Sequence, residues 1–98
     1  MKLKKLFTSA IALITVTGMA FAEPAIIYDL GGKFDKSFNE SAFNGAEKWK
    51  KENGGNYREF ELQSDAQREQ ALRRFAEAGN NPIVMAGFMF ATPLAEVA

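Results

Sequence analysis

Three short apolar runs recur along the chain, and each has the length of a β-strand. The runs Ala25–Tyr28 and Ile83–Ala86 are continuous, whereas Tyr57–Leu62 alternates apolar with charged side chains. Continuous runs of this length are typical of strands that are covered on both faces in a parallel sheet, and alternation with charge is typical of a sheet edge. The pattern therefore predicts two buried strands and, between them in the sequence, an edge strand.

The segment after the first run has the signals of a helix. Ser37 and Glu40 fit a capping box, in which the Ser37 hydroxyl accepts a hydrogen bond from the amide three residues on and Glu40 accepts one from the Ser37 amide. Apolar positions at helical spacing follow and predict a packing stripe of Phe38, Ala42, Gly45 or Ala46, and Trp49. The pair Gly54-Gly55 ends this helix.

The segment after the second run repeats the pattern. Ser64–Gln67 is a second capping box, and the helix that it opens has an apolar stripe of Ala71, Leu72, Phe75 and Ala78 before Gly79–Pro82 stops it. After the third run, Thr92 is a candidate N-cap for a third helix, with Pro93 at the first helical position, where a missing amide hydrogen costs nothing. That helix has no glycine or lysine to close it before Ala98, so we interpret the chain as the front part of a longer protein.

The order strand, helix, strand, helix, strand, helix predicts the α/β class. Because crossover connections between parallel strands are right-handed, the first strand should lie between the second and the third, in the order 2-1-3. This is half of a doubly wound lobe. Ligands of such sheets bind beyond the carboxyl ends of the strands, where the winding reverses. That place lies between the loops at residues 29–37 and 87–91.

The start of the chain has a different character. Three lysines lie within the first five positions, and residues 6–22 carry no charge and end in a small-x-small pattern that signal peptidases accept. A membrane anchor would need about 20 apolar residues, and this segment is shorter and diluted by threonines and a glycine. We predict a signal peptide over residues 1–22 and a partial lobe over residues 23–98. Because the chain has no cysteine to acylate, we expect it to be exported without a lipid anchor.

The composition of residues 23–98 excludes several classes of partner and site. Nine basic and twelve acidic side chains give a net charge of −3, which disfavours nucleic acid and anionic lipid as partners. Without histidine or cysteine the segment lacks the commonest metal ligand and the usual nucleophile and base. We therefore expect no metal, no cofactor and no catalytic residue. The segment is also small for a core of its own, so we expect that it does not fold and bind ligand alone.

Asp29, Asp35 and two glycines occupy the first junction between strand and helix. Asp29 follows the strand directly, where a carboxylate can accept hydrogen bonds from a polar ligand or hold the loop through its amides. Gly31 and Gly32 free the backbone for positive φ values and shape the loop. Asp35 precedes the capping serine and can order the loop or complement the helix dipole.

Phe38 and Asn39 lie in the first turn of the predicted helix. The Phe38 ring can belong to the core stripe, or it can face a cleft and offer a flat apolar surface on which a heterocycle stacks. The neighbouring Asn39 amide can both donate and accept hydrogen bonds. Together the two side chains suit a base-like ligand.

These residues also carry a resemblance to a known family. The run AIIYDLGGKFDKSFNESAFNGAE and the later NNPIVMAGF, behind a signal peptide, resemble the opening of the basic membrane protein family, the purine-nucleoside-receptor-like substrate-binding proteins of ABC transporters. The most specific element is D-x-S-F-N followed by a glycine, and the resemblance covers residues 23–98. It implies the fold of type I periplasmic binding proteins, in which two α/β lobes joined by a hinge close on a ligand. The chain would be the first part of the N-terminal lobe.

The resemblance implies roles for particular residues. At the position of Phe38 the family's phenylalanine stacks on the purine, and at Asn39 the asparagine hydrogen-bonds the ligand. An acid at the position of Asp29 meets the edge of the base. Phe88, in the loop after the third strand, is expected to line the same cleft.

The function that the resemblance implies is that of an exported receptor. It would bind a purine nucleoside in the periplasm or cell envelope and deliver it to an ABC permease at the outer face of the plasma membrane, with no chemistry of its own. Members of the family are often lipoproteins, which the missing cysteine speaks against here. The alternative is a secreted α/β enzyme that acts on a nucleoside or a sugar and uses Asp29 or Asp35 as its acids.

Overall fold

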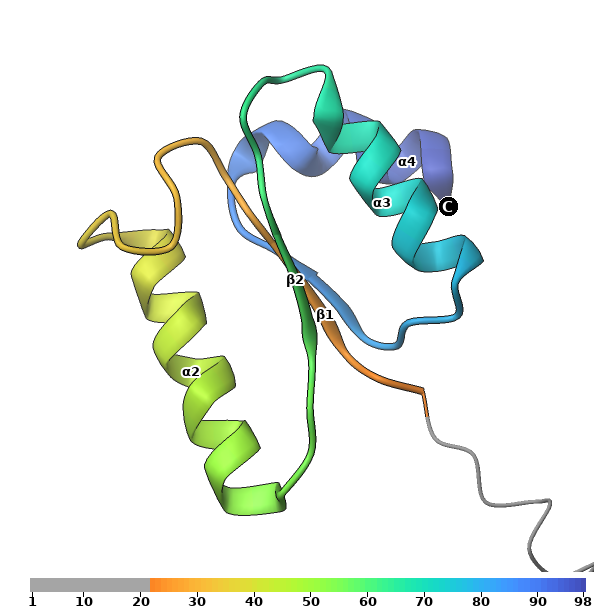
Figure 1. Ribbon diagram of the computed structural model, residues 1–98. Coiled ribbons are helices and arrows are strands. Elements are labelled where there is room, and N and C mark those ends of the chain that lie inside the picture. Colours follow the sequence, from red (N-terminus) through yellow and green to blue (C-terminus); the bar gives the residue numbers. More distant parts are fainter. Residues whose placement is uncertain (1–21) are drawn as a thin grey trace, which may run out of the picture.

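Figure 1 shows the computed structural model, which describes residues 22–98. Its strands are β1 (Ala25–Tyr28), β2 (Arg58–Glu61) and β3 (Ile83–Met85), and its helices are α2 (Phe38–Asn53), α3 (Gln67–Glu77) and α4 (Ala91–Val97), the last preceded by the short 3-10 helix η1 (Phe88–Phe90). The predicted strands and helices are therefore present in the predicted order. The predicted signal peptide, residues 1–22, lies outside the described residues except for Ala22.

The three strands form one parallel sheet in the order β2-β1-β3, which confirms the predicted topology. Ile27 of β1 lies opposite Phe60 of β2 and Met85 of β3. Helix α2 lies on one side of the sheet, and α3 and α4 lie on the other (Figure 1). Because the strands are parallel, their carboxyl ends meet at one edge of the sheet. The loops that lead into α2, α3 and η1 therefore gather at this edge.

The core lies between the sheet and the side that α3 and α4 cover. Every residue of β1 is buried, as expected for a strand that is paired on both edges. Alternate side chains of β1 join the apolar stripe of α3 and a ring of η1 in one cluster, which consists of Ala25, Ile27, Leu62, Ala71, Leu72, Phe75 and Phe90. The predicted α3 stripe is confirmed except for Ala78, which is exposed because it follows the last residue of the helix.

The opposite side of the sheet is packed less completely. Of the predicted α2 stripe, Ala42 and Ala46 are half-buried, but Phe38 is 76% exposed and Trp49 is also exposed. Val84 of β3 is 45% exposed, so β3 is not the buried strand that its apolar run predicts. The reason is that no element within residues 22–98 covers β3 on this side. An apolar groove of about 680 Å³ separates α2 from β3.

The N-terminus of α2 is capped by Asp35 and not by the predicted capping box. One carboxylate oxygen of Asp35 accepts hydrogen bonds from the amides of Ser37 at 2.8 Å and Glu40 at 3.0 Å. The other oxygen accepts one from the amide of Asn39 at 3.3 Å. The Ser37 hydroxyl makes no capping hydrogen bond, and the Glu40 side chain accepts from the Lys36 amide instead. A charged carboxylate is the stronger acceptor, and the positive φ of 56° at Lys36 turns the chain beside these amides.

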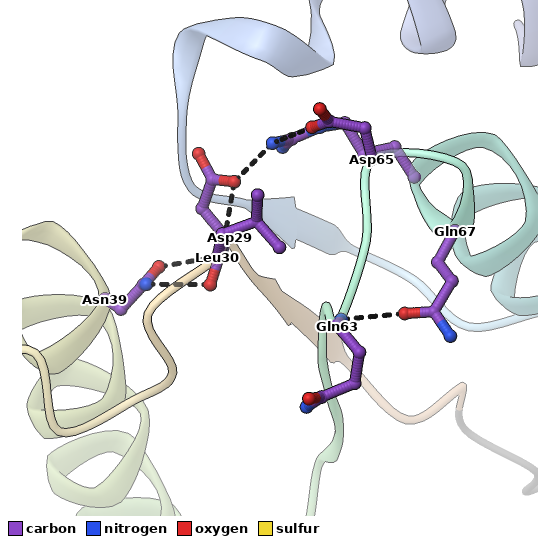
Figure 2. Close-up of polar contacts among 7 residues, drawn as sticks. Asp29, Leu30, Asn39, Gln63, Asp65 and Gln67 are labelled. Carbon is purple, nitrogen blue, oxygen red and sulfur yellow. Dashed lines mark hydrogen bonds and ion pairs between the residues drawn. The ribbon is translucent and has the colours of Figure 1, made fainter.

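The other two helix starts also differ from their predictions. Helix α3 begins at Gln67 without a side-chain cap, and the Gln67 side chain accepts a hydrogen bond from the Gln63 amide at 2.7 Å (Figure 2). Helix α4 begins at Ala91, directly after η1, so Thr92 is not its N-cap. The sequence signals locate these helix starts to within a few residues, but they do not identify the groups that cap them.

Substitution of Asp35 can distinguish the observed cap from the predicted one. Burial by itself raises the pKa of the Asp35 carboxyl, but its backbone N–H donors outweigh burial and lower the pKa below its ordinary 3.8. A carboxyl whose pKa is lower in the folded state stabilises the fold fully above its unfolded-state pKa. Its contribution is lost as the pH falls from 3.8 through the lowered folded-state value.

We expect D35N to lower the free energy of unfolding of the full-length protein at neutral pH. The further decrease in this free energy on acidification should be smaller in D35N than in the unsubstituted protein. The matched variant S37A should change the free energy of unfolding by less than about 0.5 kcal/mol, because the hydroxyl caps nothing. Urea denaturation of both variants between neutral pH and about pH 2 measures these effects. A larger decrease in the free energy of unfolding in S37A than in D35N would show that the predicted capping box, and not Asp35, caps α2.

Candidate functional site

Asp29 stands where three elements meet at the carboxyl edge of the sheet. It follows β1 directly, and its backbone is tied to the first turn of α2 by Asn39. The Asp29 amide donates to Asn39 Oδ1 at 2.9 Å, and Asn39 Nδ2 donates to the Asp29 carbonyl at 3.0 Å (Figure 2). Asn39 is 2% exposed. One amide side chain thus satisfies both backbone groups at the end of the central strand.

The Asp29 carboxylate is held by α3 as well. Its Oδ1 accepts a hydrogen bond from the Leu30 amide at 2.7 Å and lies 2.5 Å from Arg68 Nη2. The same Arg68 nitrogen lies 2.9 Å from Asp65 Oδ1. Arg68 is 4% exposed. A buried guanidinium therefore joins the end of β1 to the start of α3.

Arg68 was not among the predicted site residues, although the sequence holds a signal for it. Arg68 precedes Ala71, Leu72 and Phe75 at helical spacing, so it lies on the buried face of α3, where an arginine needs partners. Its guanidinium carbon lies 5.0 Å from the centroid of the Phe90 ring. Burial by itself lowers the pKa of the guanidinium, but hydrogen bonds to Asp29 and Asp65 outweigh burial and raise it. Arg68 therefore stays charged inside the fold.

Gly87 approaches the Asp29 carboxylate from the end of β3. Its φ is +117°, and a Cβ built on it would lie 3.0 Å from Asp29 Cγ and closer still to Oδ2. The loop after β3 thus passes directly beside the carboxylate, and only glycine fits this position. Sequence reasoning gave Gly87 no role beyond marking the end of the strand.

The predicted aromatic residues are exposed near this edge. Phe38 opens α2 and is 76% exposed, and Phe88 opens η1 and is 93% exposed. A shallow pocket of about 360 Å³ lies beside Phe88 and includes Asp65, Arg68 and Met89 in its lining. The larger groove beside β3 is lined at the amino ends of the strands by Pro24 and Pro82, and Asp29 is not part of its lining. The structure brings Asp29 and Asn39 into contact and leaves both rings free on the surface.

The loop between β1 and α2 has the backbone that its glycines predict. Gly31 and Gly32 have φ values of +106° and +80°. Lys33 anchors the loop to β2 through Glu59, with 2.6 Å between Lys33 Nζ and Glu59 Oε1. Glu59 also accepts a hydrogen bond from the buried Tyr28 at 3.0 Å. Within residues 22–98, no group of three acidic, histidine or cysteine side chains could hold a metal ion.

A family model described as ABC transporter substrate-binding protein PnrA-like matches residues 22–98. The chain belongs to this family. The match confirms the family that the D-x-S-F-N element indicates, and it agrees with a parallel sheet whose carboxyl edge carries the candidate residues.

Individual family relatives and a solved structure agree with this assignment. An uncharacterized lipoprotein of Pyrococcus furiosus is 40% identical over 78 residues, and one of Pyrococcus horikoshii is 39% identical over 75 residues. Each alignment covers 76% of this chain, and 19% and 18% of the respective relatives. A crystal structure of ABC transporter system solute-binding proteins from Aeropyrum pernix K1 is similar with a TM-score of 0.72 and 33% identity, over 80% of this chain and 21% of that chain.

The chain spans about one fifth of the length of these relatives. The solved structure is that of a solute-binding protein, which agrees with the predicted α/β fold. The Pyrococcus relatives are described as lipoproteins, whereas the 98 residues here contain no cysteine.

Substitution of Gly87 tests how tightly the loop after β3 holds the carboxylate. G87A introduces a Cβ against Asp29 and forces alanine to a positive φ, so we expect the free energy of unfolding to fall by about 1–3 kcal/mol. G45A is the matched control, because a Cβ at Gly45 meets nothing and lies within α2. It should stabilise the protein by about 0.5–1 kcal/mol. Chemical denaturation measures both, and equal effects would show that Gly87 is not constrained by Asp29.

Proposed function

We propose that the chain forms the first part of the ligand-binding lobe of a solute receptor that takes up a purine nucleoside and delivers it to an ABC permease. The observation that carries the proposal is the meeting of α2, α3 and the loop after β3 around Asp29, at the edge where such sheets bind ligands. Membership of a substrate-binding family supports it.

The exposed rings provide the apolar part of this proposed site. Phe38 projects from the N-terminus of α2 with three quarters of its surface free, so a heterocycle can stack on it without rearrangement of the core. Phe88 offers a second exposed surface in the neighbouring loop. In this proposal the base lies on Phe38 and presents its polar edge to Asp29.

Asn39 supports the site in a more specific way than the sequence predicts. Its side-chain oxygen and nitrogen each have a partner in the backbone of Asp29, which orients that residue. Asn39 is 2% exposed, so the role of its side chain in this structure is to hold the backbone of Asp29. Direct contact between Asn39 and the ligand stays a prediction.

The location proposed for the protein is the periplasm or cell envelope, at the outer face of the plasma membrane. The signal-peptide pattern of residues 1–22 supports export. The lipoprotein descriptions of the Pyrococcus relatives point to an anchored form in those proteins.

The acids named in the rival enzyme hypothesis both have contacts within the fold, Asp35 through two oxygens and Asp29 through one. Asp35 uses both carboxylate oxygens to accept backbone amides, and Asp29 uses Oδ1 to bind Arg68 and Leu30. These contacts favour a receptor without chemistry of its own. Incubation of the full gene product with inosine or guanosine separates the two hypotheses. Recovery of intact nucleoside supports the receptor, and release of free base would establish the enzyme.

Removal of the Phe38 ring tests the stacking surface. We expect F38A to weaken nucleoside binding by about tenfold or more, because stacking on an aromatic side chain contributes about 1–3 kcal/mol per base. The ring is exposed, so thermal stability should not change. Calorimetric titration of the full gene product with inosine gives the affinities.

The control for this experiment is F34L. Phe34 is another exposed ring, and its edge packs against Phe43 at 5.3 Å between centroids. F34L should keep the affinity of the unsubstituted protein. Equal affinity of F38A and the unsubstituted protein would remove Phe38 from the site.

A further inference from the structure

We propose that Arg68 is a positioning residue that fixes the Asp29 carboxylate through Oδ1 and leaves Oδ2 as the acceptor for an N–H group of the ligand. This inference rests on the proposed function, because it concerns the same site. It adds a residue that the sequence pattern did not single out, and it states which polar edge of a base the site prefers.

The guanidinium is held in place independently of Asp29. Arg68 extends from the first turn of α3 and is almost completely buried. Asp65 Oδ1 accepts hydrogen bonds from its Nε at 3.2 Å and its Nη2 at 2.9 Å, and the Phe90 ring lies 5.0 Å from its central carbon. Contacts from the loop before α3 and from η1 thus fix the orientation of the group that Asp29 meets.

The Asp29 carboxylate has little freedom once Arg68 is in place. Its Oδ1 receives the Leu30 amide at 2.7 Å and Arg68 Nη2 at 2.5 Å. The Gly87 backbone lies against the same carboxylate on the side of Oδ2. No residue of the described part of the chain donates a hydrogen bond to Oδ2, and the Asp29 side chain is 26% exposed. The two oxygens therefore differ, because Oδ1 is hydrogen-bonded within the protein, whereas Oδ2 has only the Gly87 backbone against it and no donor within residues 22–98.

An available carboxylate oxygen selects a particular edge of a base. It accepts hydrogen bonds and donates none, so it favours a ligand that presents an N–H group and disfavours one that presents a lone pair. Inosine and guanosine carry an N–H on the six-membered ring, whereas purine riboside has the same ring system and sugar without a donor at that edge. The site should therefore prefer inosine and guanosine to purine riboside.

The environment of Arg68 is poorly explained by stability alone. A buried ion pair gives little net stability, because the loss of hydration offsets the attraction between the charges. Arg68 Nη1 is buried without a hydrogen-bond partner within the described residues, which adds a cost. An apolar side chain would continue the stripe formed by Ala71, Leu72 and Phe75. What the arginine provides beyond such a side chain is a counterion for Asp29 and a fixed orientation of its carboxylate.

Three variants of the full gene product test this role. R68M replaces the arginine with an unbranched apolar side chain, and R68K retains the positive charge but not the planar guanidinium group. R73M is the matched control, because Arg73 lies on the same helix, pairs with Glu69 at 3.3 Å and is half exposed. Two measurements are made on each protein. The first is hydrogen exchange of the Leu30 amide without ligand, and the second is the ratio of the dissociation constants for purine riboside and inosine.

The proposal predicts a change in selectivity and not only in affinity. The unsubstituted protein and R73M should bind inosine about tenfold or more tighter than purine riboside, as expected for one hydrogen bond to a charged group. R68M should reduce this ratio to within about twofold while its affinity for purine riboside stays nearly unchanged, and R68K should lie between. The Leu30 amide should exchange about tenfold faster in R68M than in R73M, because its acceptor is released.

Different failures have different meanings. If R68M weakens both nucleosides equally, Arg68 has only a structural role and the proposal is overturned. An unchanged ratio in R68M overturns it as well. If the unsubstituted protein binds neither nucleoside, the proposed function fails, and the Leu30 exchange then decides the positioning role by itself: faster exchange in R68M supports it, and unchanged exchange rejects it.

Discussion

The structure depends on how the backbone N–H and C=O groups at the carboxyl end of β1 obtain hydrogen-bond partners. A central strand that is buried along its length gives its last backbone groups no access to water, so partners must come from other elements. Asn39 supplies them for Asp29 from α2. The interaction fixes the start of α2 against the end of β1, and with it the position of Phe38, the residue before Asn39. The same side chain that completes the fold therefore arranges the candidate site.

A second constraint follows from the charge of Asp29. A carboxylate at the end of a buried strand needs a counterion, and the sheet topology places the start of α3 within reach because β2 lies next to β1. Arg68 is then buried with the Phe90 ring against it, which ties η1 to the same point. The contacts around Asp29 thus connect segments that are far apart in the sequence, and they make the loop after β3 part of the site.

The fold could be predicted from the sequence because it depends on local patterns and on one rule of handedness. The apolar runs, the glycines and the right-handed crossover give β2-β1-β3 without any knowledge of packing. The site residues Asp29, Phe38 and Asn39 could be named for the same reason, since they lie next to a recognisable junction and a family motif. The residue that caps α2 could not be predicted. Ser37 and Asp35 can both accept hydrogen bonds from the first amides of the helix, and only the path of the loop selects Asp35. Arg68 and Gly87 were missed because their roles exist only when α3 and β3 are brought to Asp29.

The cap formed by Asp35 has a consequence for what the site can recognise. The free amides at the start of a helix ordinarily make a site for phosphate groups. At the start of α2 the amides of Ser37, Asn39 and Glu40 already bind the Asp35 carboxylate. A phosphate group would therefore find these amides already occupied by a carboxylate. In the proposed function, the start of α2 therefore suits an uncharged nucleoside better than the corresponding nucleotide.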